Sequence, residues 1–95
     1  MSDVIDAAVE ELSGRVQGGF DGSAKFVIEG EGAILIDAEG VRAGDDDADV
    51  TLTADTETFR AILAGDMNPT SAFMSGKLTV DGDMGLAMKL GALLG

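Results

Sequence analysis

Apolar residues recur at helical spacing in four stretches of the chain. Over residues 3–13 the apolar positions lie three or four residues apart, as on one face of an amphipathic helix. Residues that accept hydrogen bonds from free backbone N–H groups precede the three later stretches, which is typical of helix starts. The predicted helices cover residues 3–13, Asp55 or Thr56 to Gly65, Asn68 to Gly76, and, after a cap at Asp83, residues 84–94.

Single residues predict where these helices end and which side chains they bury. Gly14 is expected to end the first helix, because glycine readily adopts the left-handed conformation found at helix C-termini. Pro69 suits the first position of the third helix, where its missing N–H would have no partner. Phe73 and Met74 are expected to be the buried side chains of that helix.

Between the helices, β-branched residues cluster and apolar residues alternate with polar ones, as in strands. Because the strands follow one another and the helices bunch together, the pattern favours an α+β fold over a parallel α/β sheet. The 95 residues are enough for a single domain, 1–95, whose simplest packing is one sheet with helices on one face. Strands are predicted over residues 24–29, 33–38, 41–43, 49–53 and 77–81, the first two as a hairpin.

Charge narrows the choice of partners. The chain has 18 acidic and 6 basic residues, a net charge of −12, so it would be repelled by nucleic acid and by anionic lipid headgroups. It contains no cysteine, and its first residues lack the basic and apolar regions of a signal peptide. We therefore expect a cytoplasmic protein that does not bind nucleic acid.

The residue types that most often carry out catalysis or bind metals are missing. Histidine, cysteine, tyrosine and tryptophan are all absent, which removes the usual general base and the usual zinc ligands. Asp45, Asp47 and Asp49 resemble the start of a calcium loop, but Val50 stands where that loop needs glycine. The sequence therefore predicts no enzyme activity, no metal and no cofactor.

The last predicted helix, residues 84–94, is apolar over most of its circumference and carries a single charge. Its apolar arc is wider than one contact with a sheet requires. Four of the five methionines lie in the last third of the chain, and flexible methionines suit surfaces that accept ligands of variable shape. Such a helix either packs on two elements, faces a partner chain or covers a cavity.

The second half of the chain is similar to the sterol carrier protein type-2 (sterol-binding) domain. The resemblance is carried by Asp49-Val50-Thr51-Leu52-Thr53, Leu63-Ala64-Gly65, Met67-Asn68-Pro69, Ala72-Phe73-Met74-Ser75-Gly76-Lys77-Leu78 and Gly82-Asp83-Met84-Gly85-Leu86-Ala87-Met88-Lys89-Leu90. It implies a five-stranded, mainly antiparallel sheet with helices packed on one face, enclosing an apolar tunnel. It also implies binding of fatty acids, fatty acyl-CoA or sterols without a reaction, with the final helix as a lid.

The chain departs from the family at three places. Ala33 and Ile34 stand where members often carry an aromatic residue, and Ser75 stands where a glutamine is common. The peroxisomal address Ser-Lys-Leu does not follow Leu94. These departures favour a non-peroxisomal member and an acyl chain, rather than a sterol, as the ligand.

The alternation in the strands predicts which side chains face the helices and could touch a lipid. For most of these positions core packing is an equally good interpretation, and we favour ligand contact at Phe73, Met74, Met84 and Met88. Ser75 and Lys89, with Lys77 as a weaker choice, are candidates to meet a polar head. The full set of predicted lipid-binding residues is Phe26, Ile28, Ile34, Ile36, Val50, Leu52, Phe59, Ile62, Leu63, Phe73, Met74, Met84 and Met88, with Leu78 and Val80 completing the sheet floor.

Two functions remain open at this stage. The first is a lipid carrier, a monomer or weak homodimer that makes transient membrane contact while exchanging its ligand. The second is an interaction module, in which the apolar helix pairs with another chain such as an enzyme of lipid or acyl-CoA metabolism.

Overall fold

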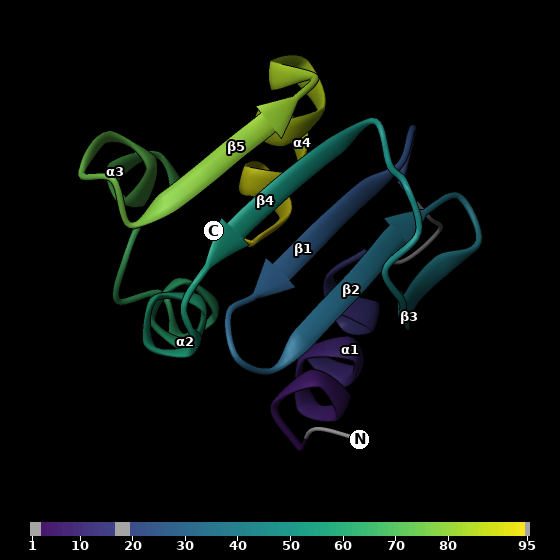
Figure 1. Ribbon diagram of the computed structural model, residues 1–95, viewed down its shortest axis with the longest axis horizontal. Helices are drawn as coiled ribbons and strands as arrows, with labels where there is room; N and C mark the ends of the chain where they lie inside the picture. Colours follow the sequence, from purple (N-terminus) through teal and green to yellow (C-terminus); the bar gives the residue numbers. More distant parts are fainter. Residues whose placement is uncertain (1–2, 17–19, 95) are drawn as a thin grey trace.

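The computed structural model describes residues 3–16 and 20–94, which form one five-stranded sheet and four helices (Figure 1). The sheet has the order β3-β2-β1-β4-β5, and every neighbouring pair is antiparallel except β1 and β4, which are parallel. This confirms the predicted α+β fold with a mainly antiparallel sheet. The elements are α1 (Asp3–Arg15), β1 (Ala24–Ile28), β2 (Gly32–Asp37), β3 (Gly40–Ala43), β4 (Val50–Ala54), α2 (Thr56–Ala64), α3 (Pro69–Met74), β5 (Leu78–Gly82) and α4 (Met84–Leu94).

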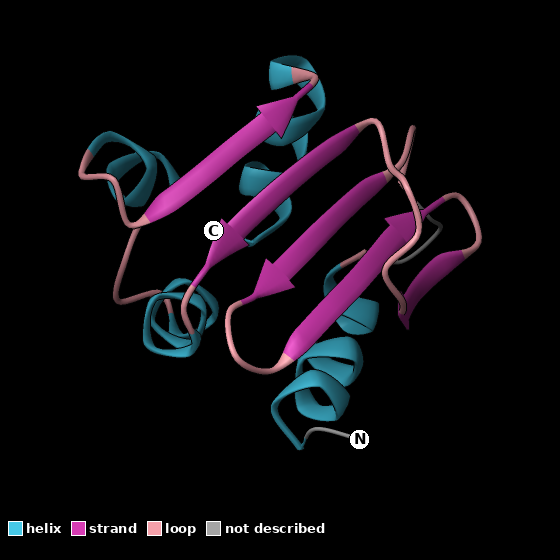
Figure 2. Cartoon of the chain, viewed as in Figure 1, coloured by secondary structure: helices cyan, strands magenta, loops and turns pink. Residues whose placement is uncertain are grey.

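The helices lie behind the sheet in the view of Figures 1 and 2, as predicted. Helix α1 packs against β2 and β3, α4 packs against β1, β4 and β5, and α3 lies beside the edge strand β5. The other face of the sheet is crossed by the connection between β3 and β4. In that connection Asp45 forms a 3.0 Å ion pair with Lys25, and a side-chain carbon added to Gly44 would lie only 2.7 Å from the buried side chain of Leu35.

Helix starts follow the predicted capping residues. The Asp55 carboxylate accepts a hydrogen bond from the backbone N–H of Thr58 at 2.7 Å, and Asp83 accepts one from Leu86 at 3.1 Å. Asn68 caps α3, with Pro69 as the first helical residue. The side-chain oxygens of the predicted capping residues therefore accept hydrogen bonds from backbone N–H groups in the first turns of three helices.

The end of α1 differs from the prediction. Gly14 does not stop the helix, which continues to Arg15. The Arg15 guanidinium, about one quarter exposed, donates hydrogen bonds to the carbonyl oxygens of Leu63 and Leu94, the first at 2.6 Å. These carbonyls lie at the C-terminal ends of α2 and α4, where a positive charge is favourable. Arg15 thus connects α1 to α2 and α4, and these hydrogen bonds stabilise the last turn of α1.

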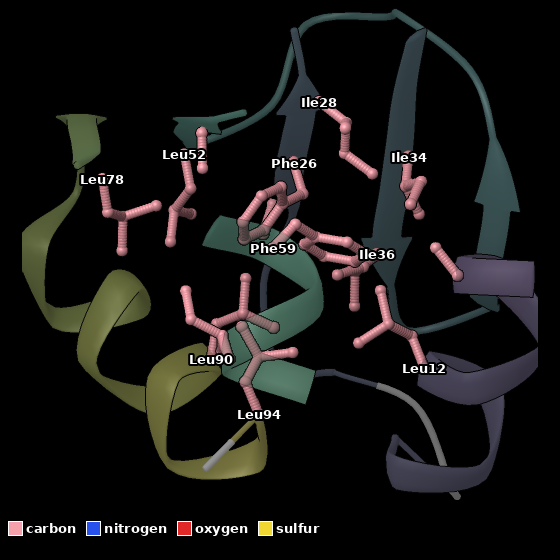
Figure 3. Close-up of a cluster of buried hydrophobic side chains, with 14 of the residues drawn as sticks. Leu12, Phe26, Ile28, Ile34, Ile36, Leu52, Phe59, Leu78, Leu90 and Leu94 are labelled. Carbon is pink, nitrogen blue, oxygen red and sulfur yellow. The ribbon is translucent and has the colours of Figure 1, made fainter. Parts of the chain in front are cut away.

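Figure 3 shows the main core, which lies between the sheet and the helices under β1, β2 and β4. Phe26 of β1 and Phe59 of α2 meet edge to face, with ring centroids 4.7 Å apart and an interplanar angle of 61°. Ile34, Leu12 and Leu90 surround this pair and are fully buried. Side chains from strands and helices interdigitate here, as expected of a close-packed interior.

Candidate functional site

A groove opens between α3, α4 and the β4–β5 side of the sheet, and we call it the α3–α4 groove. Its volume is about 510 Å³, within the roughly 300–1,000 Å³ that is usual for small-molecule sites. An added side-chain carbon on Gly91 of α4 would lie 3.7 Å from Pro69 of α3, so the two helices approach each other closely here. The lining residues are Leu52, Asn68, Pro69, Thr70, Phe73, Met74, Leu78, Val80, Met84, Ala87, Met88, Gly91 and Ala92.

The floor of the groove is the sheet. Leu52 and Leu78 are buried, and Val80 is half-buried on the edge strand β5. Leu52 pairs with Val80 and Ala54 pairs with Leu78, so the register of β4 and β5 brings these side chains to one face. The sequence predicted Leu52, Leu78 and Val80 as sheet-floor residues, and all three lie at this site.

Three methionines, Met74, Met84 and Met88, surround the mouth of the groove, and we call them the methionine lip. Met74 and Met88 are 81% and 75% exposed, so the groove is open to solvent. The prediction that Phe73 and Met74 are buried was wrong, since Phe73 is also 42% exposed. A helix of six residues has one narrow inner face, which here is filled by Pro69 and Ala72.

The groove brings together five of the predicted lipid-binding residues, namely Leu52, Phe73, Met74, Met84 and Met88. Seven others lie in the main core, do not line the groove and are each no more than 1% exposed. They are Phe26, Ile28, Ile34, Ile36, Val50, Phe59 and Ile62. Leu63 lines a different hollow, of about 400 Å³, between α1 and α2.

The predicted head-group residues are also turned away from the groove. The hydroxyl of Ser75 donates to the carbonyl of Ala72 at 3.1 Å, within the last turn of α3. The ammonium of Lys89 lies 3.4 Å from Asp21, on the side of α4 that faces the segment before β1. Neither residue lines the groove, so contact of either with a ligand stays a prediction.

Several lining residues were missed by the sequence reasoning because they are small or polar. On α4 the signal was present, since Ala87, Gly91 and Ala92 fall at helical spacing on the same face as Met84 and Met88. Small residues at these positions leave space that larger ones would fill. The polar groups Asn68 and Thr70 were missed as lining because Asn68 was assigned only to capping.

The described part of the chain contains no cluster of acidic side chains suited to metal binding. No three acidic side chains gather in a way that could hold a metal ion among residues 3–16 and 20–94. The two carboxyls with shifted pKa values lie away from the groove. The pKa of Asp37 is lowered by its hydrogen bonds from Arg42, and the pKa of Asp55 by the backbone N–H of Thr58.

No helix in the described residues is both long enough and apolar enough to cross a membrane.

Comparison with known proteins identifies the family to which this chain belongs. The family model described as the SCP-2 sterol transfer family matches residues 4–95. The chain belongs to this family. The predicted resemblance is therefore confirmed, and it extends over the first half of the chain as well.

Curated relatives are longer proteins. Hydroxysteroid dehydrogenase-like protein 2 of Xenopus laevis is 44% identical over 82 residues, which cover 78% of this chain and 20% of the relative. Sterol carrier protein 2 of Homo sapiens is 45% identical over 64 residues, which cover 67% of this chain and 11% of the relative. The chain thus matches a fifth or less of these two proteins, and the activity of the remainder says nothing about this domain.

Solved structures of the family share the fold over nearly the whole chain. Sterol Carrier Protein-2 of Aedes aegypti in complex with the C16 fatty acid palmitate has a TM-score of 0.79 at 24% identity, covering 99% of this chain and 96% of that one. Sterol Carrier Protein 2 Like 2 of Aedes aegypti has a TM-score of 0.77 at 24% identity, covering 94% of each chain.

Proposed function

We propose that this domain is a non-catalytic lipid carrier that holds a single-chain or sterol-like lipid in the α3–α4 groove. The observation that carries the proposal is an open groove lined almost entirely by apolar side chains, on a domain of the sterol transfer family. One Aedes aegypti relative of the same fold was solved with palmitate. The apolar tunnel implied by the resemblance would then be this groove, closed over by the methionine lip when a lipid is present.

Burial of the lipid tail supplies the affinity. Each methylene transferred from water to the groove is worth about 0.8 kcal/mol. Met74, Met84 and Met88 have no branched carbon next to the backbone, so they can move aside for chains of different thickness. A tail of ordinary length can therefore be held after the entropic cost of association is subtracted, without a strong polar contact.

We further propose that the domain has no reaction of its own. Related proteins named as enzymes match over a small part of their length, so their chemistry need not belong to this domain. A cytoplasmic location, a monomer or weak homodimer, absence of nucleic-acid binding and transient membrane contact complete the proposal. The net charge of −12 supports the exclusion of nucleic acid.

Uptake of a neutral fluorescent lipid by the purified domain tests the carrier function. The variant Met88→Asp places a charge in the lip at a side chain that is 75% exposed, so it should weaken uptake severalfold while leaving thermal unfolding nearly unchanged. The matched control Ser71→Asp adds the same charge on α3 at an exposed residue that does not line the groove. Equal uptake by wild type and Met88→Asp, or no uptake by a folded wild type, would count against the carrier.

An interaction module is the second candidate, and the exposed lip favours it specifically. Exposed apolar side chains that lie together often mark contacts with another protein. Under this hypothesis the lip would pair with an enzyme of lipid or acyl-CoA metabolism or with a second copy. Native mass spectrometry separates the two functions, because a carrier shows a monomer with bound lipid and a module shows a complex without it.

A further inference from the structure

Methionine is the side chain of this protein that a hydroperoxide oxidises most readily. Cysteine, histidine, tyrosine and tryptophan, which also react with common oxidants, are all absent from the chain. The methionine thioether takes up one oxygen atom and becomes a sulfoxide, which converts a flexible apolar side chain into a polar one. The response of the domain to such an oxidant therefore depends on where its methionines lie. They are Met1, Met67, Met74, Met84 and Met88.

The methionines differ in exposure, and the exposed ones line the α3–α4 groove. Met74 and Met88 are 81% and 75% exposed, and Met84 is 48% exposed. Met67 is half-buried and packs against the main core. Met1 lies outside the described residues. A peroxide in solution reaches exposed sulfur first, so Met74 and Met88 should be oxidised before Met84, and Met67 more slowly than any of the three.

Oxidation of the two most exposed methionines should leave the fold intact. Helix α3 packs through Pro69 and Ala72, and α4 packs through residues such as Leu90. Met74 and Met88 contribute little to this packing, because most of each side chain is in contact with water. A sulfoxide at either position stays solvated while the groove is empty. The stability of the empty domain should therefore change little.

The same sulfoxides disfavour a filled groove. In the proposed carrier the methionine lip closes over the lipid, which removes Met74 and Met88 from water. The polar side chains of the lining, Asn68 and Thr70, lie at the start of α3, whereas Met74 is its last residue. The sulfoxide oxygen is then either buried against the lipid tail without a donor or turned out to water, which leaves the mouth of the groove uncovered. Both arrangements weaken binding of the lipid.

We propose that Met74 and Met88 form a redox modification site, at which oxidation to methionine sulfoxide by a hydroperoxide releases the lipid without unfolding the domain. This proposal rests on the proposed carrier function and adds a means of regulating it. Enzymes of the methionine sulfoxide reductase class restore the thioether, one enzyme for each epimer of the sulfoxide. Because both side chains are exposed in the folded protein, the modification is reversible there.

The oxidation step is balanced with hydrogen peroxide as the one co-reactant. A lone pair of the thioether sulfur attacks one peroxide oxygen, and an S–O bond forms as the O–O bond breaks. The leaving hydroxide takes the proton from the oxygen now bound to sulfur and becomes water. The sulfur is oxidised and the peroxide is reduced, so the products are the sulfoxide and water.

Peptide mass spectrometry of the folded domain during exposure to dilute hydrogen peroxide tests the modification site. Met74 and Met88 should each gain one oxygen atom before Met67 does. A bound neutral fluorescent lipid should slow the gain at these two positions, because the filled groove covers them. Oxidation of Met67 as fast as Met74 and Met88 overturns the assignment. The mapping without lipid tests the site even where the carrier function fails.

Uptake of the same neutral lipid, measured after the peroxide is removed, tests the release. The affinity of the wild type should fall about fivefold or more, with nearly unchanged thermal unfolding, and should recover after treatment with both reductases and a dithiol. Undiminished uptake by protein oxidised at Met74 and Met88 overturns the release and leaves the carrier function standing. A loss of uptake that accompanies unfolding also overturns it. A folded, untreated wild type that takes up no lipid overturns the carrier function and the release with it.

Leucine variants separate the methionine lip from the other methionines. A protein with Met74→Leu, Met84→Leu and Met88→Leu combined has apolar side chains of similar volume in the lip and no sulfur there. Its uptake after peroxide treatment should equal its own uptake before treatment. Met67→Leu is the matched control, and its uptake should fall after treatment as that of the wild type does. A fall in the lip variant, or protection by Met67→Leu, contradicts the proposal.

Discussion

The inner face of the sheet is covered in two different ways along its width. Under β1 and β2 it meets large side chains, such as Leu12 of α1 and Phe59 of α2, and no lining of the α3–α4 groove comes from these two strands. Under β4 and β5 it meets α3 and α4, whose facing residues include Ala87 and Gly91. The helix residues that face the two halves of the sheet are similarly hydrophobic but differ in size. Small residues between α3 and α4 leave a groove that large residues would fill.

The largest expected effect is the loss of stability when a large side chain is truncated in the close-packed core under β1 and β2. Truncation at the α3–α4 groove should cause no comparable loss. Phe26→Ala removes a ring that is fully buried against Phe59, and it should lower the free energy of unfolding by about 3–5 kcal/mol. Met74→Ala removes a mostly exposed side chain of the lip and should cost less than about 0.5 kcal/mol. Urea unfolding of both variants measures the contrast. Similar losses would mean that the two regions are packed alike.

The next effect concerns the link between the regions. Arg15→Leu removes hydrogen bonds from a guanidinium to the ends of α2 and α4 and should lower stability by about 2 kcal/mol, because hydrogen bonds to charged groups are the stronger kind. Arg15→Lys keeps the charge but has no fork to reach both carbonyls, so an intermediate loss is expected in the same thermal unfolding assay. A Lys variant as stable as wild type would show that charge alone suffices.

A smaller effect, of opposite sign, distinguishes the groove from an ordinary helix surface. Gly91→Ala and Gly14→Ala both replace a helical glycine, and each should stabilise the domain by about 0.5–1 kcal/mol. The added carbon meets ordinary contact at Gly91 and nothing within 4 Å at Gly14. Lipid titration should therefore show weaker uptake only for Gly91→Ala, because it narrows the groove. If both variants take up less lipid, the cause is the stiffer helix rather than a narrower groove.

The smallest effect is a dependence on pH at the start of α2. The pKa of Asp55 is lowered by the hydrogen bond from the Thr58 N–H, so the folded state favours the ionised form. Its contribution to stability is present above the ordinary aspartate pKa and is lost as the pH falls through the lowered value. Asp55→Asn retains a capping oxygen and should remove this component from the acid limb of a thermal unfolding profile. Identical acid limbs for the two proteins would contradict the assignment.

The sequence allowed the fold to be predicted more fully than the site. The caps at Asp55, Asn68 and Asp83 are local signals, because each side chain bonds a backbone N–H only two or three residues further on. All three caps are present in the structure. The face that α3 turns to the sheet depends on tertiary packing, so the burial of Phe73 and Met74 was predicted wrongly.

The same limit applies to the lining. Apolar residues on β1 and β2 look like ligand contacts in the sequence, but α1 packs against β2, α4 packs against β1, and Phe59 of α2 meets Phe26 of β1. Whether an inward-facing residue such as Ile34 meets a helix or an open space is decided by the partner element, and alternation along one strand carries no information on it. The small residues of α4 were the signal that distinguished the groove, and they were overlooked.

The methionine lip has a consequence for crowded solutions of this protein. Two copies could cover their exposed sulfur-containing side chains by facing each other, but each carries a charge of −12. This repulsion reaches roughly 10 Å at 0.1 M ionic strength and only about 3 Å at 1 M. Added salt should therefore act as an association switch, with self-pairing in concentrated electrolyte and separate molecules in dilute buffer.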